Sequence, residues 1–171
     1  MKIRTAVISD LPKMLEMTSQ ASARIAKMGF DQWQHGYPDE DTLRQDIADK
    51  NAYIAEIDDK PAGMMALTFT DLDCYEKIDG KWINDGFYCA VHRLCVADGF
   101  EKRGVATALF AAAEMIASER GFGSVRVDTH EQNAPMRHTL EKCGYTHCGR
   151  ITLIGSAEDG HKREAYQKVL K

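Results

Sequence analysis

The sequence predicts an α/β protein in which helices cover one mixed β-sheet. Along its 171 residues, segments with helical spacing of apolar residues alternate with short strand-like runs. The clearest case joins an apolar strand at residues 88–96, a polar turn at 97–104 and an apolar-striped helix at 105–120. Neither a repeat nor a linker breaks this alternation, so we expect a single domain over residues 1–171.

The first half of the chain combines helical and strand periods. We expect, in chain order, a strand at residues 2–7, a helix capped by Asp10 and running to about residue 28, a second helix at 41–49, and strands at 52–57 and 63–70. The stripe of the first helix is Leu11, Met14, Leu15, Ala21, Ile25 and Met28. The turn-forming residues 58–62 indicate a hairpin between the two strands.

The second half begins with a polar stretch at residues 71–86, which we expect to be an insertion before the strand at 88–96. Gly121 ends the helix that follows this strand. The remaining elements are expected to be a strand at 124–130, a helix at 134–142, and strands at 145–154 and 163–169.

Composition narrows the class of protein. With 44% hydrophobic and 28% charged residues the chain is ordinary for a globular protein, and no apolar run approaches the roughly 20 residues of a membrane span. A net charge of −4 argues against a nucleic-acid partner. Five cysteines, an odd number without a CxxC pair, indicate reduced thiols, so we expect a cytoplasmic protein without membrane or nucleic-acid partners.

The turn before the central helix has the chemistry of an anion site. A helix that starts after a glycine-containing turn presents unpaired N–H groups and a positive dipole end. Lys102 and Arg103 make this turn cationic, and Gly104 ends it. The alternative is an ordinary loop glycine between two solvated charges.

Three segments together resemble a known family. The triplet Leu94-Cys-Val96, the loop Glu101-Lys-Arg-Gly-Val-Ala106 and the later Asn133…Gly144-Tyr145 are similar to the GNAT superfamily of acetyl-CoA-dependent N-acetyltransferases. The resemblance implies the GNAT fold, a central mixed sheet with two splayed parallel strands flanked by helices. It also implies acetyl-CoA as cofactor. Glu101 departs from the family's arginine or glutamine.

The resemblance places the coenzyme A site on this chain. It implies that the strand edge at Leu94 and Val96 pairs with the pantetheine arm, as an extended chain adds to a sheet. A backbone N–H near Cys95 or Val96 would stabilise the oxyanion. The expected cofactor residues are Leu94, Cys95, Val96, Lys102, Arg103, Gly104, Val105, Ala106, Thr107 and Asn133. For Asn133, an N-cap role in the following helix is an equal alternative.

Transfer to an amine needs a general base more than a general acid. Deprotonating a lysine-like ammonium at neutral pH costs about 4–5 kcal/mol, whereas releasing a thiolate costs only about 2 kcal/mol. His92 is the candidate base, because strand alternation would place it on one face with Tyr88, Ala90, Leu94 and Val96. A histidine at this offset resembles the arylalkylamine acetyltransferases of the family. The alternative is a core histidine bonded to a neighbour.

Asp128 is the second candidate catalytic residue. Arg126, Asp128 and His130 share one strand face, and buried ionisable groups need partners. Asp128 is expected to pair with Arg93 or His92 and orient the catalytic region, or else to form a purely structural ion pair.

The family's usual general acid is a tyrosine, and the position that corresponds to it holds Leu140. Either the thiolate leaves unaided, or Tyr88 or Tyr166 serves.

The expected acceptor residues are Trp33, Tyr37, Tyr88 and His130. Packing of Trp33 in the core is an alternative. No metal site is expected, because the spacing of Cys143, His147 and Cys148 matches no zinc pattern.

The sequence therefore predicts an acetyltransferase that moves acetyl to the primary amine of a small molecule by direct attack in a ternary complex. A protein or peptide amine as acceptor, or a catalytically weak acyl-CoA-binding sensor, are the alternatives. Dimers are common in the family, and the sequence leaves a homodimer open.

Overall fold

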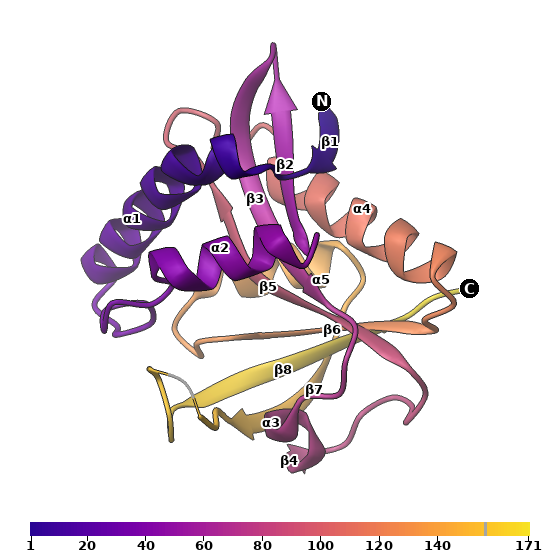
Figure 1. Cartoon of the computed structure of the whole chain (residues 1–171). Coiled ribbons are helices and arrows are strands. Elements are labelled where there is room, and N and C mark those ends of the chain that lie inside the picture. The colour runs from indigo at the N-terminus through magenta and orange to yellow at the C-terminus, as the bar shows by residue number, and fades with distance from the viewer. Residues whose placement is uncertain (156) are drawn as a thin grey trace.

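The computed structural model describes residues 1–155 and 157–171 and contains one eight-stranded sheet (Figure 1). Its strands lie in the order β1-β2-β3-β5-β6-β8-β7-β4. They are β1 (Lys2–Thr5), β2 (Ala52–Ile57), β3 (Lys60–Thr68), β4 (Ile78–Gly80), β5 (Tyr88–Val96), β6 (Ser124–Thr129), β7 (Thr146–Thr152) and β8 (Lys162–Val169). The helices are the 3₁₀ turn η1 (Ile8–Asp10), α1 (Leu11–Lys27), α2 (Glu40–Ala48), α3 (Asp73–Glu76), α4 (Val105–Glu119) and α5 (Ala134–Lys142). The predicted mixed α/β class is confirmed.

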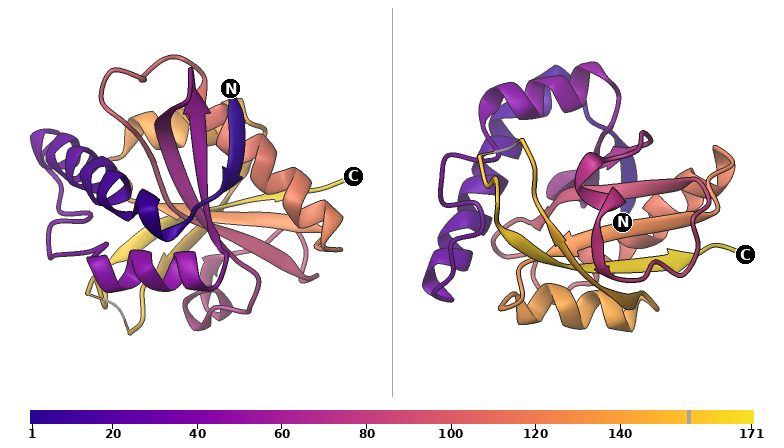
Figure 2. Two further views of the ribbon diagram at one scale, coloured as in Figure 1. Left: turned by 45° about the horizontal axis from the view of Figure 1, so that its top comes forward. Right: turned by 90° about the horizontal axis from the view of Figure 1, so that it is seen from below.

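Helices cover both faces of this sheet. Figures 1 and 2 show α1 and α2 on one side and α4 and α5 on the other. Neighbouring strands are antiparallel except for β5 and β6, which pair in parallel at the centre. The sheet twists strongly, so that β6 and β8 cross the direction of β2 and β3 (Figure 1).

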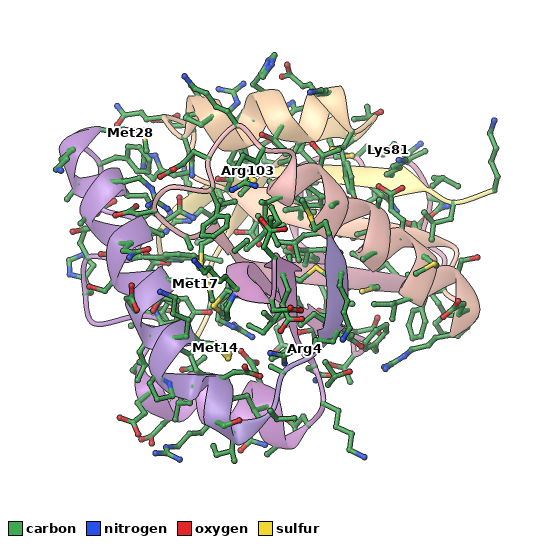
Figure 3. All side chains as sticks on the ribbon, turned by 90° about the horizontal axis from the view of Figure 1, so that it is seen from above. Arg4, Met14, Met17, Met28, Lys81 and Arg103 are labelled. Atoms are coloured by element: carbon green, nitrogen blue, oxygen red, sulfur yellow. The ribbon has the colours of Figure 1, made fainter. Side chains whose placement is uncertain are left out.

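Two apolar layers hold the helices to the sheet. Beneath α1, Met14 and Met17 are fully buried against β2 and β3 (Figure 3). On the other face, α4 packs so closely on β3 that a Cβ at Gly63 would lie 2.6 Å from Val105 Cγ1 and 2.9 Å from the Cys95 carbonyl oxygen. Glycine at position 63 therefore sets the distance between α4 and the sheet.

The elements differ from the sequence prediction at two places. Asp10 does not cap α1 with its side chain, because that carboxylate accepts bonds of 2.7 and 2.8 Å from Arg4 and one from the Val7 N–H. Residues 71–86 do not form a simple insertion. They contain α3 and the edge strand β4, and they bury Tyr75 and Trp82 against the sheet.

No helix in the described part of the chain has the length and apolar character needed to cross a membrane.

Candidate active site

A β-bulge lies at the centre of the candidate site. The pairing of β3 with β5 shifts by one residue between Met64 and Ala66, so Arg93 and Leu94 together face Met65. Arg93 has a φ of 53°, in the left-handed region, which marks the irregular position.

Because of the bulge, the two halves of β5 present opposite alternations of side chains to the two faces of the sheet. Tyr88 and Ala90 pack beside α3, whereas Leu94 and Val96 belong to the layer under α4. The expectation that His92 shares a face with Leu94 and Val96 is therefore wrong. The extra residue at the bulge exchanges the two faces of the strand at this point.

The central parallel strands separate at the same level. Val91 with Val127 is the last parallel pair, although β5 continues to Val96 and β6 to Thr129. Thr129 is 1% exposed, and its Oγ1 has no hydrogen-bond partner among the described residues. Beyond Val91 the two strands thus leave backbone polar groups unpaired between them, and Thr129 adds an unpartnered hydroxyl at the end of β6.

The pairing pattern shows which groups of β5 are free. The Ala97 N–H donates to the Ala62 carbonyl at 2.9 Å, a bond that flanks the pair Val96 with Gly63 and marks it as a non-hydrogen-bonded pair. The N–H and C=O of Val96 consequently point away from β3. Arg24 of α1 donates from Nη2 to the Val96 carbonyl at 2.6 Å. The Val96 N–H faces the gap and is available to an extended ligand.

The N-terminus of α4 lies just after this strand. Gly104 is the N-cap with a φ of 79°, and no side chain caps the helix. Residues 101–104 are exposed, and Arg103 lies over the Phe100 ring at 5.2 Å from its centroid (Figure 3). Glu101, the departure from the family motif, accepts from the Gly99 N–H at 2.8 Å and so braces the turn. The first-turn N–H groups, up to that of Thr107, remain free for an anion.

Asn133 is the N-cap of α5, which is the alternative role stated for it above. Its Oδ1 accepts from the Met136 N–H at 3.3 Å, which caps α5, and its amide donates to Gln32 Oε1 at 3.3 Å. It is also 9% exposed. Both of its side-chain ends are thus engaged within the protein.

His92 directly follows Val91, the last residue of β5 that pairs with β6. Burial, together with the neighbouring Arg93 charge, lowers the pKa of His92 to about 3. The ring is therefore neutral near pH 7 and offers a lone pair, although it holds a proton poorly.

Asp128 occupies the equivalent place on β6, because it directly follows Val127, the last residue of β6 that pairs with β5. The Tyr75 hydroxyl donates to its Oδ1 at 2.7 Å. The expected pairing with Arg93 or His92 is wrong. No ion pair of Asp128 occurs in the described chain, and burial raises the pKa of its carboxyl. By accessible surface the side chain is only partly buried, and the charge of Arg163 acts to lower its pKa, but a carboxylate without an ion pair within this described part of the chain still favours a cation beside it.

Arg93 instead pairs with Asp46 of α2. Its Nε and Nη2 donate to the two carboxylate oxygens at 2.7 and 2.6 Å, and its Nη1 donates to the Tyr37 hydroxyl at 2.6 Å. Burial raises the pKa of Tyr37, and the charges of Asp46 and Asp128 add to this rise. The bonds of Arg93 to Tyr37 and Asp46 thereby hold the loop before α2, and α2 itself, against β5.

The other expected acceptor residues lie in different surroundings. Trp33 is 9% exposed in the core beneath α1, and its backbone N–H donates to Glu158 Oε1 at 2.6 Å. His130 stacks on Phe30 with ring centroids 4.6 Å apart. The Tyr88 hydroxyl accepts from the Leu72 N–H at 2.9 Å beside α3. Of the four acceptor candidates, Tyr37 is bonded to Arg93 of β5, and the Tyr88 ring lies 5.8 Å from that of Tyr75, the hydrogen-bond partner of Asp128.

Tyr166, Leu140 and Cys95, the other residues considered near the thioester, offer no free acid or thiolate. The Tyr166 hydroxyl accepts from Arg137 Nε at 3.0 Å, and Leu140 is fully buried in the core. Burial raises the pKa of the Cys95 thiol to about 12, so it stays protonated near pH 7.

Sequence reasoning missed three groups that build the site. These are Tyr75, which bonds Asp128, the Asp46 partner of Arg93, and Arg24, which bonds the Val96 carbonyl. An arginine inside an apolar strand is itself a signal, because its buried charge requires an acidic partner elsewhere in the chain.

Comparisons with known proteins agree with this geometry. The model of the Acetyltransferase (GNAT) family matches residues 17–145. A GNAT-family acetyltransferase from Streptococcus agalactiae 2603 shares 33% identity and a TM-score of 0.87, over 99% of this chain and 95% of that chain.

Two more distant structures share the fold alone. A GNAT-family acetyltransferase from Listeria monocytogenes 4b F2365 has 20% identity and a TM-score of 0.74, over 99% of this chain and 94% of that one. The PaiA N-acetyltransferase from Thermoplasma acidophilum, in complex with coenzyme A, has 16% identity and a TM-score of 0.69, over 98% of each chain. No match to this chain is found among the curated proteins. The sequence and the fold together show that this chain is an acyltransferase enzyme that belongs to the GNAT family of acetyltransferases.

Proposed function

We propose that the protein transfers acetyl from acetyl-CoA to the primary amine of a small molecule by direct attack in a ternary complex. Acetyl-CoA supplies the acyl group as a thioester. The observation that carries the proposal is the separation of β5 and β6 after Val91 and Val127, which leaves the Val96 N–H facing a gap. The uncapped α4 begins shortly after the end of β5, and the partly buried Asp128 carboxyl directly follows the last residue of β6 that pairs with β5.

The donor half of the site fits a pyrophosphate and a pantetheine arm. The N–H groups at the start of α4 would hold the pyrophosphate, with Lys102 and Arg103 supplying positive charge. Val96 would pair with an amide of the arm, and the unpartnered Thr129 hydroxyl offers a second polar contact. Leu94 and Cys95 supply apolar wall on either side of the strand.

The acceptor half of the site fits a cationic amine. Asp128 has a partly buried carboxyl that forms no ion pair among the described residues, and the Tyr75 hydroxyl donates to it. An ammonium group entering here would be bound by Asp128, which favours the ionised carboxylate. A neutral molecule gains no such ion pair, so amines are favoured over alcohols.

Asp128 and His92 then have distinct roles in this proposal. Asp128 binds the ammonium and accepts its proton. The raised pKa of the Asp128 carboxyl lies closer to the pKa of the ammonium than an ordinary carboxyl pKa does, and this eases the transfer. His92 accepts a hydrogen bond from the neutral amine and orients its lone pair, since its own low pKa keeps the ring uncharged.

Initial-rate kinetics with a panel of amines, read by release of the free CoA thiol, test the proposal. Direct attack predicts intersecting double-reciprocal lines for the two substrates, whereas parallel lines would indicate an acetylated enzyme and contradict it. Turnover with peptides but no small amine would favour the protein-acetylating alternative. Binding of CoA without any turnover would favour the sensor.

Matched variants assign the two side chains. Asp128→Asn keeps the size of the side chain and removes its charge, so kcat should fall while CoA affinity is retained. Asp79→Asn, on the exposed edge strand β4, is the control that should leave kcat unchanged. His92→Gln should also lower kcat, and His138→Gln, exposed on α5, should not.

A further inference from the structure

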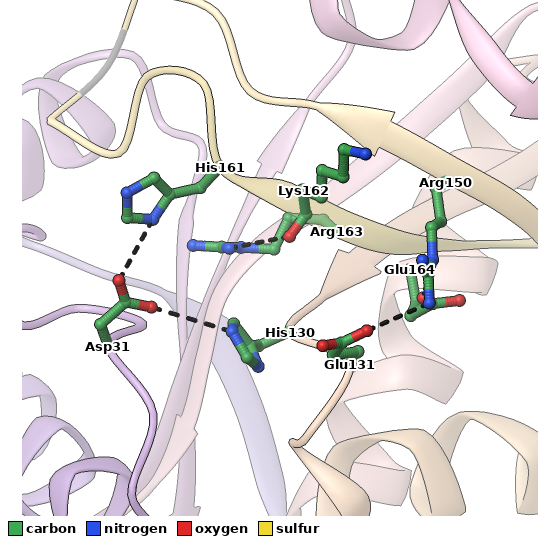
Figure 4. A pocket seen from close by; sticks show the side chains of 8 residues that line it. All are labelled: Asp31, His130, Glu131, Arg150, His161, Lys162, Arg163 and Glu164. Carbon is green, nitrogen blue, oxygen red and sulfur yellow. Dashed lines mark hydrogen bonds and ion pairs between the residues drawn. The ribbon is translucent and has the colours of Figure 1, made fainter.

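A group of histidines surrounds Asp31 at the edge of the acceptor region. Asp31 Oδ2 lies 3.9 Å from His35 Nε2 and 3.7 Å from His161 Nδ1, and Asp31 Oδ1 lies 3.8 Å from His130 Nε2. Figure 4 shows the Asp31 carboxylate between the rings of His130 and His161, with His161 at the start of β8. These four residues come from three segments that are far apart in the sequence.

Three of the four residues converge as metal ligands would. One ligand atom from each of Asp31, His35 and His161 lies within 4.8 Å of the other two. Tetrahedral zinc with bonds of about 2.0–2.1 Å needs ligand atoms about 3.3 Å apart, so the group must contract by about an ångström. Asp31 and His35 are exposed, and a rotation of their side chains can supply that contraction.

His130 supports this group without joining it. The Gln132 N–H donates to His130 Nδ1 at 3.1 Å, so in the neutral ring the proton lies on Nε2, the atom that faces Asp31. A metal bound at Nε2 would force that proton onto Nδ1, against the Gln132 N–H. His130 Nε2 therefore faces Asp31 Oδ1 as a donor at 3.8 Å, and a small approach of the carboxylate would give the hydrogen bond by which outer-shell groups orient ligands in metal sites.

We propose that Asp31, His35 and His161 bind one Zn²⁺ ion, with water completing its coordination. Two imidazoles and a carboxylate form a donor set for zinc and similar transition metals, whereas Mg²⁺ and Ca²⁺ prefer oxygen ligands alone. The site adjoins a hollow of about 260 Å³ lined also by Glu131, Arg150 and Arg163, which gives the ion a path from solvent (Figure 4).

The bound ion would tie two parts of the fold together. Asp31 and His35 belong to the loop between α1 and α2, which continues to Tyr37, bonded to Arg93 of β5, while His161 directly precedes β8. The Trp33 N–H already joins this loop to Glu158. Bound zinc would thus link the loop between α1 and α2 to the start of β8, and it would raise the thermal stability of the protein.

Titration calorimetry of the chelator-treated protein with Zn²⁺ tests this site. We expect one ion per chain for the wild type and at least a tenfold loss of affinity in both Asp31→Asn and His161→Gln. His138→Gln and Cys143→Ser, the latter at a partly exposed thiol, should bind as the wild type does. Mg²⁺ should give no saturable heat.

Two further readouts separate this site from the catalytic proposal, because neither depends on turnover. Zn²⁺ should raise the melting temperature of the wild type but not of Asp31→Asn, and Co²⁺ should produce visible absorption bands that His161→Gln lacks. Absence of stoichiometric Zn²⁺ binding, or binding that survives both ligand substitutions or disappears in Cys143→Ser, would overturn the proposal.

Discussion

The neutral, partly buried His92 predicts a specific loss of stability as the pH falls. Burial and the Arg93 charge lower the pKa of His92 to about 3 in the folded protein, while an unfolded chain has the ordinary value of about 6.5. Below pH 6.5 the unfolded state therefore binds the proton and the folded state does not. Stability is full above that pH, and it declines until the pH reaches the folded pKa.

The magnitude follows from these two pKa values. At pH 7.5 the protonation of the unfolded state contributes almost nothing. At pH 5 it favours unfolding by about 2 kcal/mol, from RT times the logarithm of a roughly 30-fold difference in protonation. With a urea m-value of about 2 kcal/mol per molar, this corresponds to a shift of roughly 1 M in the unfolding midpoint.

Urea unfolding at pH 7.5 and pH 5, followed by circular dichroism, measures this loss of unfolding free energy. His92→Gln removes the titration, so the midpoint of the variant should move about 1 M less between the two pH values than that of the wild type. His138→Gln, at an exposed position, should keep the wild-type shift. Equal shifts in His92→Gln and the wild type would refute the assignment of His92 as a partly buried neutral histidine.

Three further predictions concern the carboxylate, the helix contact and the buried ion pair. Asp128→Asn should lower kcat by about 10²–10⁴ while the melting temperature changes little, and an unchanged kcat would leave Asp128 with a structural role only. Gly63→Ala should cost about 1–3 kcal/mol in chemical unfolding, because the new methyl meets Val105 at 2.6 Å; no loss would mean that α4 can move away freely. Arg93→Ala should cost about 3–5 kcal/mol by leaving Asp46 buried without its partner, and the Arg93→Ala/Asp46→Ala double variant should recover part of that loss. A double variant as unstable as the sum of the two single variants would contradict the pairing.

Local pattern was sufficient to predict most of the elements. The helix at α4 follows from apolar spacing between Gly104 and Gly121, and the strand at β5 from a continuous apolar run. Both signals lie within one segment, so they need no knowledge of the rest of the chain. The short elements α3 and β4 escaped detection because their order comes from packing of Tyr75 and Trp82 against distant strands.

The site was harder to predict than the fold, since its decisive features involve two or more segments. The bulge at Arg93 is defined only by its register with β3, and it reverses the face on which Leu94 lies. The partner of Asp128 comes from α3, a segment that sequence pattern had assigned no structure. The histidines around Asp31 have no recognisable spacing, because the fold alone brings them together.

The central claim is that coenzyme A lies between β5 and β6 with its pyrophosphate at the start of α4. A crystal structure of the protein soaked with coenzyme A tests this most directly. We expect the diphosphate oxygens within hydrogen-bond distance of the backbone N–H groups from Gly104 to Thr107, and an amide of the arm bonded to the Val96 N–H. A diphosphate bound elsewhere, or an arm that does not enter the gap beyond Val91 and Val127, would contradict the account.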